Sequence, residues 1–314
     1  MFENIAAIDI GSSSVKLITL KTGFSDFTIK DFVIEEVDPT FENHDEAIID
    51  AIIRVLEQED ISGYKVVTNL PMEKSIIRNI SFPFSDVEKI AEAIPFEAEE
   101  KIPFKYEDLI LDFQPMKSAK PEEGRVLLGA THKQTMLSFL NLLKEQNISP
   151  IRMGLEANAL FECYKYFNTN KDESIIQVDI GHNKSIINII KDNSLVFTRS
   201  ISIGINTIIK SIGKILKQKY PDAISTYRKL AIDISSLENN EQKGNYKKFK
   251  ISKPKLREIY TSCNSIIENL IEQVSLTIKA FQVDFDSITF NRILVSGGGS
   301  TITGLRPLIS KHLN

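Results

Sequence analysis

Tryptophan is absent from this chain of 314 residues, cysteine occurs only twice, and histidine occurs only four times. The two cysteines, Cys163 and Cys263, are too few for a disulfide framework and suit a protein of a reducing compartment. Neither has another cysteine or a histidine at metal-ligand spacing, and the histidines form no motif. The sequence therefore gives no sign of a zinc site or of a disulfide-rich secreted fold.

Long apolar runs and an excess of positive charge are also missing. No stretch of about 18 apolar residues occurs, so we expect no membrane span in this chain. The N-terminal segment MFENIAAIDIG lacks the basic and apolar regions of a signal peptide. The net charge of −4 and the pI of about 5.7 argue against a nucleic-acid-binding protein.

What the sequence does contain is a repeated segment. Residues 7–18 read AIDIGSSSVKLI, and residues 177–188 read QVDIGHNKSIIN. Each is an apolar strand that ends in Asp-Ile-Gly, followed by a short polar turn and a second apolar strand. Asp9 and Asp179 lie 170 residues apart, too far for a short-period repeat protein. Together with the length of the chain, this repeat predicts two homologous lobes.

A separate unit is predicted to be inserted into the first lobe. From residue 74 the pattern reads strand, helix, strand, strand, helix, which is typical of a small α+β module. Its first helix is predicted to begin at a capping box of Ser85 and Glu88 and to be kinked or divided at Pro95. We assign 1–73 to the first lobe, 74–150 to the insert, 151–173 to a return to the first lobe with the inter-lobe connection, and 174–314 to the second lobe. In the second lobe, residues 242–253 lack periodicity and are predicted to form a loop.

The turn of the first copy carries groups that suit an anion. Gly11 lets the backbone approach a ligand without a Cβ in the way, and successive N–H groups in such a turn form an anion-binding nest. Asp9 could hold a hydrated Mg²⁺ ion beside phosphate oxygens. Hydroxyl and ammonium groups add further donors, at Ser12, Ser13, Ser14 and Lys16. The alternative is an ordinary hairpin with a serine-rich turn.

Asp179, Gly181 and Ser185 place a similar turn in the second lobe, and two such turns on facing walls of a cleft would clamp a nucleotide. A third signal follows the apolar strand predicted at 292–295, where residues 296–300 read SGGGS before a helix. Three glycines permit close approach of the backbone, here to an adenine or a ribose. The spacing is not that of the dinucleotide-binding fingerprint, and a flexible link between strand and helix is the alternative.

In order and spacing, these three motifs resemble the phosphate-1, phosphate-2 and adenosine motifs of the actin/Hsp70/sugar-kinase ATPase superfamily. The resemblance covers nearly the whole chain. It implies an α/β fold of two actin-like (ribonuclease H-like) lobes with the small α+β subdomain inserted. It narrows to the PilM/GspL type, because the segments 7–16, 95–104, 197–204 and 294–299 are similar to PilM-type pilus assembly proteins. The insert resembles that of FtsA in its position.

The resemblance implies a site for ATP and Mg²⁺. The residues that would contact the β- and γ-phosphates are Gly11, Ser12, Ser13, Ser14 and Lys16 on one side, and Gly181 and Ser185 on the other. Asp9 and Asp179 would flank the metal through water. The adenosine would be bordered by Gly297, Gly298 and Gly299.

Two residues are implied as catalytic, Asp179 and Glu156. Glu156 matches the position where actin-like ATPases often keep a group that positions water, although a carboxylate at a helix start is an equal alternative. Two features depart from the family pattern: the bulky polar turn of His182, Asn183 and Lys184, and the lack of a clear glutamate in residues 225–229. We therefore expect nucleotide binding with slow or absent ATP hydrolysis.

The resemblance also implies a role and partners. We expect a cytoplasmic scaffold, peripheral to the inner membrane, of a type IV pilus or a type II secretion machine. A groove at the edge of the insert would accept a peptide of a bitopic membrane protein, PilN-like or GspM-like. The candidate groove residues are Ile90, Ile94, Phe96, Ile102 and Phe104. A secretion or pilus ATPase would be a further partner, and a homo-oligomer stays open.

Two alternatives belong to the same superfamily. An FtsA-like filament protein would end in a linker and an amphipathic membrane helix, which we do not expect here because the sequence stops soon after its last predicted helix. A small-molecule kinase would need a base to accept the proton of the substrate hydroxyl, and no segment offers an obvious candidate.

Overall fold

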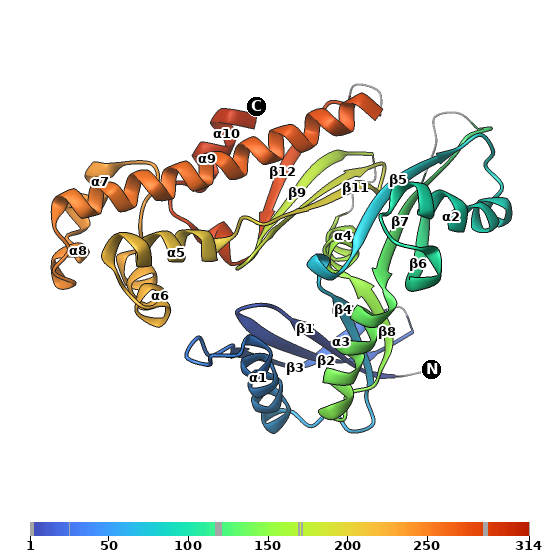
Figure 1. The fold of residues 1–314 in the computed structure, drawn as a ribbon, viewed down its shortest axis with the longest axis horizontal. Helices are drawn as coiled ribbons and strands as arrows, with labels where there is room; N and C mark the ends of the chain where they lie inside the picture. Colours follow the sequence, from blue (N-terminus) through green and yellow to red (C-terminus); the bar gives the residue numbers. More distant parts are fainter. Residues whose placement is uncertain are drawn as a thin grey trace. The chain divides into compact units, whose positions relative to one another are not determined.

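A computed structural model of the chain describes residues 3–24, 26–116, 121–168, 170, 172–284 and 288–313 (Figure 1). The chain divides into two compact units. Unit 1 contains residues 1–173 and 188–198, and unit 2 contains residues 174–187 and 199–314.

The first lobe is built on a five-stranded sheet in the order β3-β2-β1-β4-β8. Its strands are β1 (Asn4–Ile10), β2 (Ser14–Thr22), β3 (Phe27–Glu36), β4 (Lys65–Leu70) and β8 (Pro150–Leu155). The first three strands pair antiparallel, whereas β4 and β8 add to β1 in parallel. Alternate side chains of β1 and β2 are buried, which is the pattern of a sheet with one face on a core.

The core of this lobe lies between the sheet and two helices, α1 (His44–Gln58) and α3 (Lys133–Glu145). Phe139 and Leu143 of α3 are buried in it beside Leu17 of β2. This corrects the predicted insert of 74–150, because α3 was assigned to the insert and packs in the first lobe instead. Helical periodicity identifies α3, but it does not say which core the apolar face will meet.

The insert is a three-stranded antiparallel sheet, β5-β7-β6, with a helix on one face. Its elements are β5 (Ile76–Phe82), α2 (Val87–Lys101), the 3₁₀ turn η2 (Tyr106–Asp108), β6 (Leu109–Met116) and β7 (Gly124–His132). Leu128 of β7 and Ile90 and Ile94 of α2 share a core of their own. Because neighbouring residues of a strand point to opposite faces, Leu127 and Gly129 lie on the other face of this sheet.

The start of α2 differs from the predicted capping box. The N-cap is Asp86, not Ser85, and its Oδ1 accepts the backbone N–H groups of Glu88 at 3.0 Å and Lys89 at 3.2 Å. A carboxylate that accepts two N–H groups satisfies more of the free donors at a helix start than one hydroxyl would. The helix runs on through Pro95 to Lys101, so the structure does not divide it there.

The second lobe repeats the strand order of the first. Its sheet, β11-β10-β9-β12, consists of β9 (Ser174–Ile180), β10 (Ser185–Lys191), β11 (Ser194–Ile201) and β12 (Arg292–Ser296). β12 pairs with β9 in parallel, as β4 pairs with β1. The series β3-β2-β1-β4 therefore recurs strand for strand, which confirms the duplication predicted from the two Asp-Ile-Gly segments.

The helices of unit 2 are α5 (Ile205–Leu216), α6 (Tyr220–Leu230), α7 (Leu237–Lys243), α8 (Asn245–Lys248), α9 (Lys253–Asp284) and α10 (Leu305–Leu313), with the 3₁₀ turn η3 (Gly298–Thr301). In this unit, α5, α7 and α10 pack against the long helix α9, and α6 packs against α5 (Figure 1). The predicted loop over 242–253 contains α8, because Tyr246 is buried and anchors it. Among the described residues, no helix is long and apolar enough to cross a bilayer.

Candidate functional site

The turn between β1 and β2 is closed by its glycine. The N–H of Gly11 donates to the carbonyl oxygen of Ser14 at 3.0 Å, and a Cβ on Gly11 would lie 3.0 Å from that same oxygen. Ser12 and Ser13 form the tip of the turn. On the β3 side, the carbonyl of Ser13 accepts the N–H of Val37 at 3.0 Å. The four predicted phosphate-binding residues 11–14 therefore form one tight turn.

The two charged residues of this turn face each other. Asp9 and Lys16 are directly paired in the register of β1 and β2, and Lys16 Nζ lies 2.6 Å from Asp9 Oδ2. Both side chains are partly exposed, at 46% for Asp9 and 38% for Lys16. An ion pair this exposed contributes at most about 1 kcal/mol, so a phosphate or a hydrated cation can compete for either partner.

The turn between β9 and β10 has the same geometry. The N–H of Gly181 donates to the carbonyl oxygen of Lys184 at 2.9 Å, and a Cβ on Gly181 would lie 2.9 Å from it. The two copies thus share a closing hydrogen bond as well as a sequence pattern. The hydroxyl of Ser185 is buried and donates to the carbonyl of Ile203 at 2.7 Å. Since the fold already uses this hydroxyl, its part in phosphate binding stays a prediction.

The start of α5 holds the second turn from outside. The N–H groups of Ile205 and Asn206 donate to the carbonyls of Gly181 at 3.1 Å and His182 at 2.8 Å. This close approach requires glycine at the helix start, because a Cβ on Gly204 would lie 2.3 Å from the carbonyl oxygen of His182. The carbonyls of the turn are therefore occupied by α5.

The bulky polar side chains of this turn form hydrogen bonds with neighbouring elements. His182 Nε2 lies 2.9 Å from the hydroxyl of Tyr220, the first residue of α6, and that hydroxyl donates to Asn206 Oδ1 at 2.9 Å. Asn206 Nδ2 in turn donates to Asn183 Oδ1 at 2.6 Å. A tyrosine hydroxyl is protonated at neutral pH and can donate, and burial raises the pKa of Tyr220 further. His182 and Asn183, which stand where the family usually has small residues, thus form a polar network that connects the turn to α5 and α6.

The glycine-rich segment lies beside the second turn. Ser296 pairs with Asp179 in the parallel register of β12 and β9, and its hydroxyl donates to Asp179 Oδ1 at 2.8 Å. Gly297 has a φ of +79°, and a Cβ there would lie 2.5 Å from the carbonyl oxygen of Ile180. A Cβ on Gly299 would lie 2.2 Å from Ile180 Cγ2. Packing against the end of β9 therefore already requires both glycines.

Gly298 is less confined, because the nearest atom to a Cβ there is Ile205 Cδ1 at 3.3 Å. The structure therefore brings the second turn and the glycine run together within unit 2. Whether the turns of the two units share one cleft stays a prediction.

Glu156 begins α4 (Glu156–Phe167), directly after β8. Its Oε2 accepts the N–H of Met72 at 2.7 Å, in the 3₁₀ turn η1 (Met72–Lys74) that follows β4. This contact joins the ends of two neighbouring parallel strands. It supports the interpretation of a carboxylate at a helix start, and a role in positioning water stays a prediction.

No set of three or more histidine, cysteine, aspartate or glutamate side chains within the described ranges could hold a metal ion directly. A hydrated Mg²⁺ needs only one or two carboxylates plus phosphate oxygens. Asp9 and Asp179 stand at the ends of the corresponding strands β1 and β9, so each can supply one carboxylate.

A cavity of about 480 Å³ lies in unit 1, between the insert and the first lobe. Its insert wall is the face of the sheet away from α2 and includes Ile77, Leu127 and Gly129. The opposite wall comes from β4, β8, α3 and α4, through Leu70, Met136, Met153, Leu155 and Asn158. Apolar atoms make up the larger part of the lining, and polar side chains such as Asp112 and Thr131 contribute to it as well. Between the walls, Asn158 Nδ2 donates to Gln114 Oε1 at 3.3 Å.

None of the groove residues expected from the sequence lines this cavity. Ile90, Ile94 and Ile102 are core residues of the insert, and Phe96 and Phe104 are exposed. Apolar residues on α2 gave a strong helical signal, whereas the residues that line this cavity come from strands and helices that are distant in sequence. The one sequence signal available was Gly129, a glycine within a strand pattern, which often marks a close approach or a bulge.

Comparison with known proteins shows which family and which solved structures share this architecture. A family model described as type IV pilus assembly protein PilM matches residues 7–233, more than half of the chain. A solved PilM–PilN type IV pilus biogenesis complex matches with a TM-score of 0.78 and 18% identity, over 98% of this chain and 85% of that one.

More distant actin-like structures match as well. MreB5 of Spiroplasma citri bound to AMPPNP gives a TM-score of 0.52 at 12% identity, over 98% of this chain and 89% of that one. EutJ from Carboxydothermus hydrogenoformans gives 0.51 at 13% identity, over 100% and 82%. These matches confirm the two-lobed actin-like fold. The cytoplasmic domain of EpsL of Vibrio cholerae reaches only 0.44 at 12% identity, over 64% and 71%, and carries no argument for type II secretion. The chain belongs to the PilM family of type IV pilus assembly proteins.

Proposed function

We propose that this chain is a nucleotide-binding scaffold of a type IV pilus machine, and that it docks an extended peptide of a bitopic, PilN-like inner-membrane protein. The observation that carries the docking part is the apolar cavity between the insert and the first lobe. The solved PilM–PilN complex shows that a relative with this architecture assembles with PilN. The family match favours the pilus over a secretion machine, so we propose a PilN-like rather than a GspM-like partner.

The shape of the cavity favours an extended peptide. Four consecutive residues of β6 line it: Asp112, Phe113, Gln114 and Pro115. Since consecutive residues of a strand point to opposite faces, a cavity lined by all four must reach the edge of β6. β6 is an edge strand of its sheet. An added peptide strand could therefore pair with its main chain while alternate side chains enter the apolar cavity.

The nucleotide part of the proposal rests on the first turn. A tight glycine turn with serine hydroxyls and a lysine that is held by an exposed ion pair matches the donors that a triphosphate needs. Asp9 and Asp179 would hold hydrated Mg²⁺, which would neutralise phosphate charge when bound. We propose slow or absent hydrolysis, because Glu156 is already engaged with the backbone of Met72.

The remaining parts of the role follow from the family. We propose that the chain works in the cytoplasm at the inner membrane, held there by its membrane partner, beside the pilus ATPase. Self-association into a homo-oligomer, an FtsA-like filament and small-molecule kinase activity have no specific observation in their favour.

Filling the cavity tests the docking site. A fluorescent peptide from the cytoplasmic segment of the PilN-like partner is titrated with wild type and with Gly129→Leu, and its anisotropy is followed. A Cβ on Gly129 would lie 3.3 Å from Leu155 Cδ1, so the longer leucine side chain must occupy the cavity. We expect the dissociation constant to rise at least about tenfold, the equivalent of losing one well-placed contact of ~1.4 kcal/mol.

The matched control is Phe96→Ala, which removes a side chain that is 75% exposed on α2 of the same insert. It should leave peptide affinity unchanged. Equal affinity of wild type and Gly129→Leu would show that this cavity does not receive the peptide. A wild-type protein that does not bind the peptide at all would contradict the docking proposal as a whole.

A further inference from the structure

We infer that Arg54 is a positioning residue for the phosphate-binding turn 11–14: it fixes the end of β3, and β3 in turn orients the Ser14 N–H toward the phosphate. The inference rests on the proposed nucleotide site. It assigns a role in ligand binding to a side chain that the three motifs do not contain.

The peptide group between Ser13 and Ser14 is held by the end of β3. The carbonyl of Ser13 accepts the N–H of Val37 at 3.0 Å, next to the paired residues Ser14 and Glu36 of β2 and β3. A trans peptide group is planar, so the N–H of Ser14 points opposite to the Ser13 carbonyl. It therefore points away from β3, toward the inside of the turn. The direction of this N–H depends on the place of Val37.

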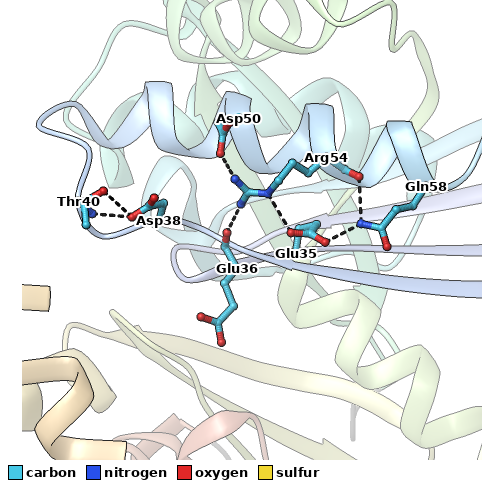
Figure 2. A network of polar contacts seen from close by, with 7 residues as sticks. All are labelled: Glu35, Glu36, Asp38, Thr40, Asp50, Arg54 and Gln58. Atoms are coloured by element: carbon cyan, nitrogen blue, oxygen red, sulfur yellow. Dashed lines mark hydrogen bonds and ion pairs between the residues drawn. The ribbon is translucent and has the colours of Figure 1, made fainter.

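The end of β3 is held by two side chains of α1. Figure 2 shows Arg54 reaching from α1 to two consecutive β3 residues: its Nε lies 2.9 Å from Glu35 Oε2, and its Nη2 donates to the carbonyl of Glu36. Gln58 Nε2, one turn further along α1, donates to Glu35 Oε1 at 2.6 Å. The next residue after these two is Val37. Arg54 and Gln58 therefore bind the segment that leads directly into the Val37 contact.

The position of β3 explains why such a contact is needed. β3 lies at the edge of its sheet, with only β2 as a neighbour, so its end gains backbone partners within the sheet from one side. A guanidinium suits the opposite side, because its planar group can bind a carboxylate and a carbonyl at once, which a lysine cannot do with the same geometry. The ion pair with Glu35 joins side chains that are only 34% and 24% exposed.

The chain after Val37 is also held. Asp38 Oδ1 accepts both the N–H of Thr40 at 2.8 Å and its hydroxyl at 2.7 Å, which closes a short turn before α1 (Figure 2). Val37 itself is buried in the core of the first lobe. The Val37 N–H is thus fixed from both directions, with Arg54 and Gln58 of α1 holding the residues before it and the Asp38 turn following it.

The test compares two residues of the same polar network. Arg54→Met removes the bonds to Glu35 and Glu36, while Asp50→Asn changes the partner of Arg54 that lies on α1 and does not touch β3. Calorimetry with Mg-ATP should show a dissociation constant about tenfold higher for Arg54→Met, as expected when one hydrogen bond to a charged group is misaligned. Amide hydrogen exchange without nucleotide should be faster in 11–16 and 33–41. Asp50→Asn should change neither measurement.

A purely structural role for Arg54 would lower the melting temperature and leave the dissociation constant and the exchange of 11–16 at their wild-type values, which would overturn the inference. If Arg54→Met does not fold, Glu35→Gln takes its place, with a smaller change expected in the same direction. Wild type that shows no heat with Mg-ATP would defeat the proposed nucleotide site. In that case hydrogen exchange still decides whether Arg54 holds the turn, so the two failures are distinguishable.

Discussion

At the first turn, the charged residues that could bind a ligand are close in sequence, whereas the residues that support the turn come from distant parts of the chain. Asp9 and Lys16 are seven residues apart and are brought face to face by one hairpin, so their proximity follows from the strand–turn–strand pattern. Arg54 and Glu35 are 19 residues apart, and His182 and Tyr220 are 38 apart. Hydrophobic periodicity in the sequence does not predict such contacts, because they depend on which faces of two elements meet.

Glu35 should make the stability of the protein depend on pH. Hydrogen bonds from Gln58 and then Arg54 lower its pKa below the ordinary 4.5. A lowered carboxyl pKa means that the stabilisation is complete above about pH 4.5 and is lost as the pH falls through the folded value. At pH 7, Glu35→Gln should reduce the free energy of urea unfolding by about 1 kcal/mol.

The same comparison at lower pH tests whether the pKa of Glu35 is lowered in the folded protein. Wild type and Glu35→Gln should approach equal stability as the pH is lowered beneath 4.5, because the wild-type carboxyl becomes protonated and loses its advantage. A difference between the two proteins that stays constant from pH 7 into this range would contradict the assignment of the lowered pKa to this network.

At the scale of elements, helices and strands themselves could be predicted, whereas their partners could not. Alternating and helical periods identify β1, β2 and α3, since each has a strong apolar face. The N-cap at Asp86 is a local contact, but Ser85 and Asp86 are both good N-cap residues, so residue type alone does not decide between them. The allocation of α3 to the first lobe and the cavity wall made by β7 depend on packing between distant segments. The contact of α5 with the second turn belongs to the same class.

Gly204 tests that contact. A Cβ there would lie 2.3 Å from the His182 carbonyl oxygen and 2.7 Å from that of Gly181, and both are backbone atoms that cannot move aside cheaply. Gly204→Ala should therefore destabilise the protein by about 1–3 kcal/mol in thermal or urea unfolding.

Gly298→Ala serves as the control for Gly204→Ala. The nearest atom to a Cβ at Gly298 is the end of the flexible Ile205 side chain at 3.3 Å, so a much smaller loss is expected. Equal stability of Gly204→Ala and wild type would mean that α5 does not approach the turn as closely as the structure shows.

At the scale of the whole molecule, a duplicated strand order supplies two equivalent turns, and an insert adds a cavity to the first lobe. Leu155 lines that cavity, and the next residue, Glu156, binds the backbone of Met72 beyond β4. A peptide bound in the cavity as proposed would therefore lie next to the ends of β4 and β8 in the first lobe. If peptide and nucleotide affinities are coupled, thermodynamic linkage requires each ligand to change the affinity of the other by the same factor.

The most direct test of the account is calorimetric titration of Mg-ATP into wild type, Asp9→Ala and the control Asp31→Ala, which removes an exposed carboxylate from β3 in the same lobe. The account predicts binding by wild type and by Asp31→Ala, and affinity at least about tenfold weaker for Asp9→Ala, the equivalent of ~1.4 kcal/mol. Equal heats and affinities for wild type and Asp9→Ala would contradict it.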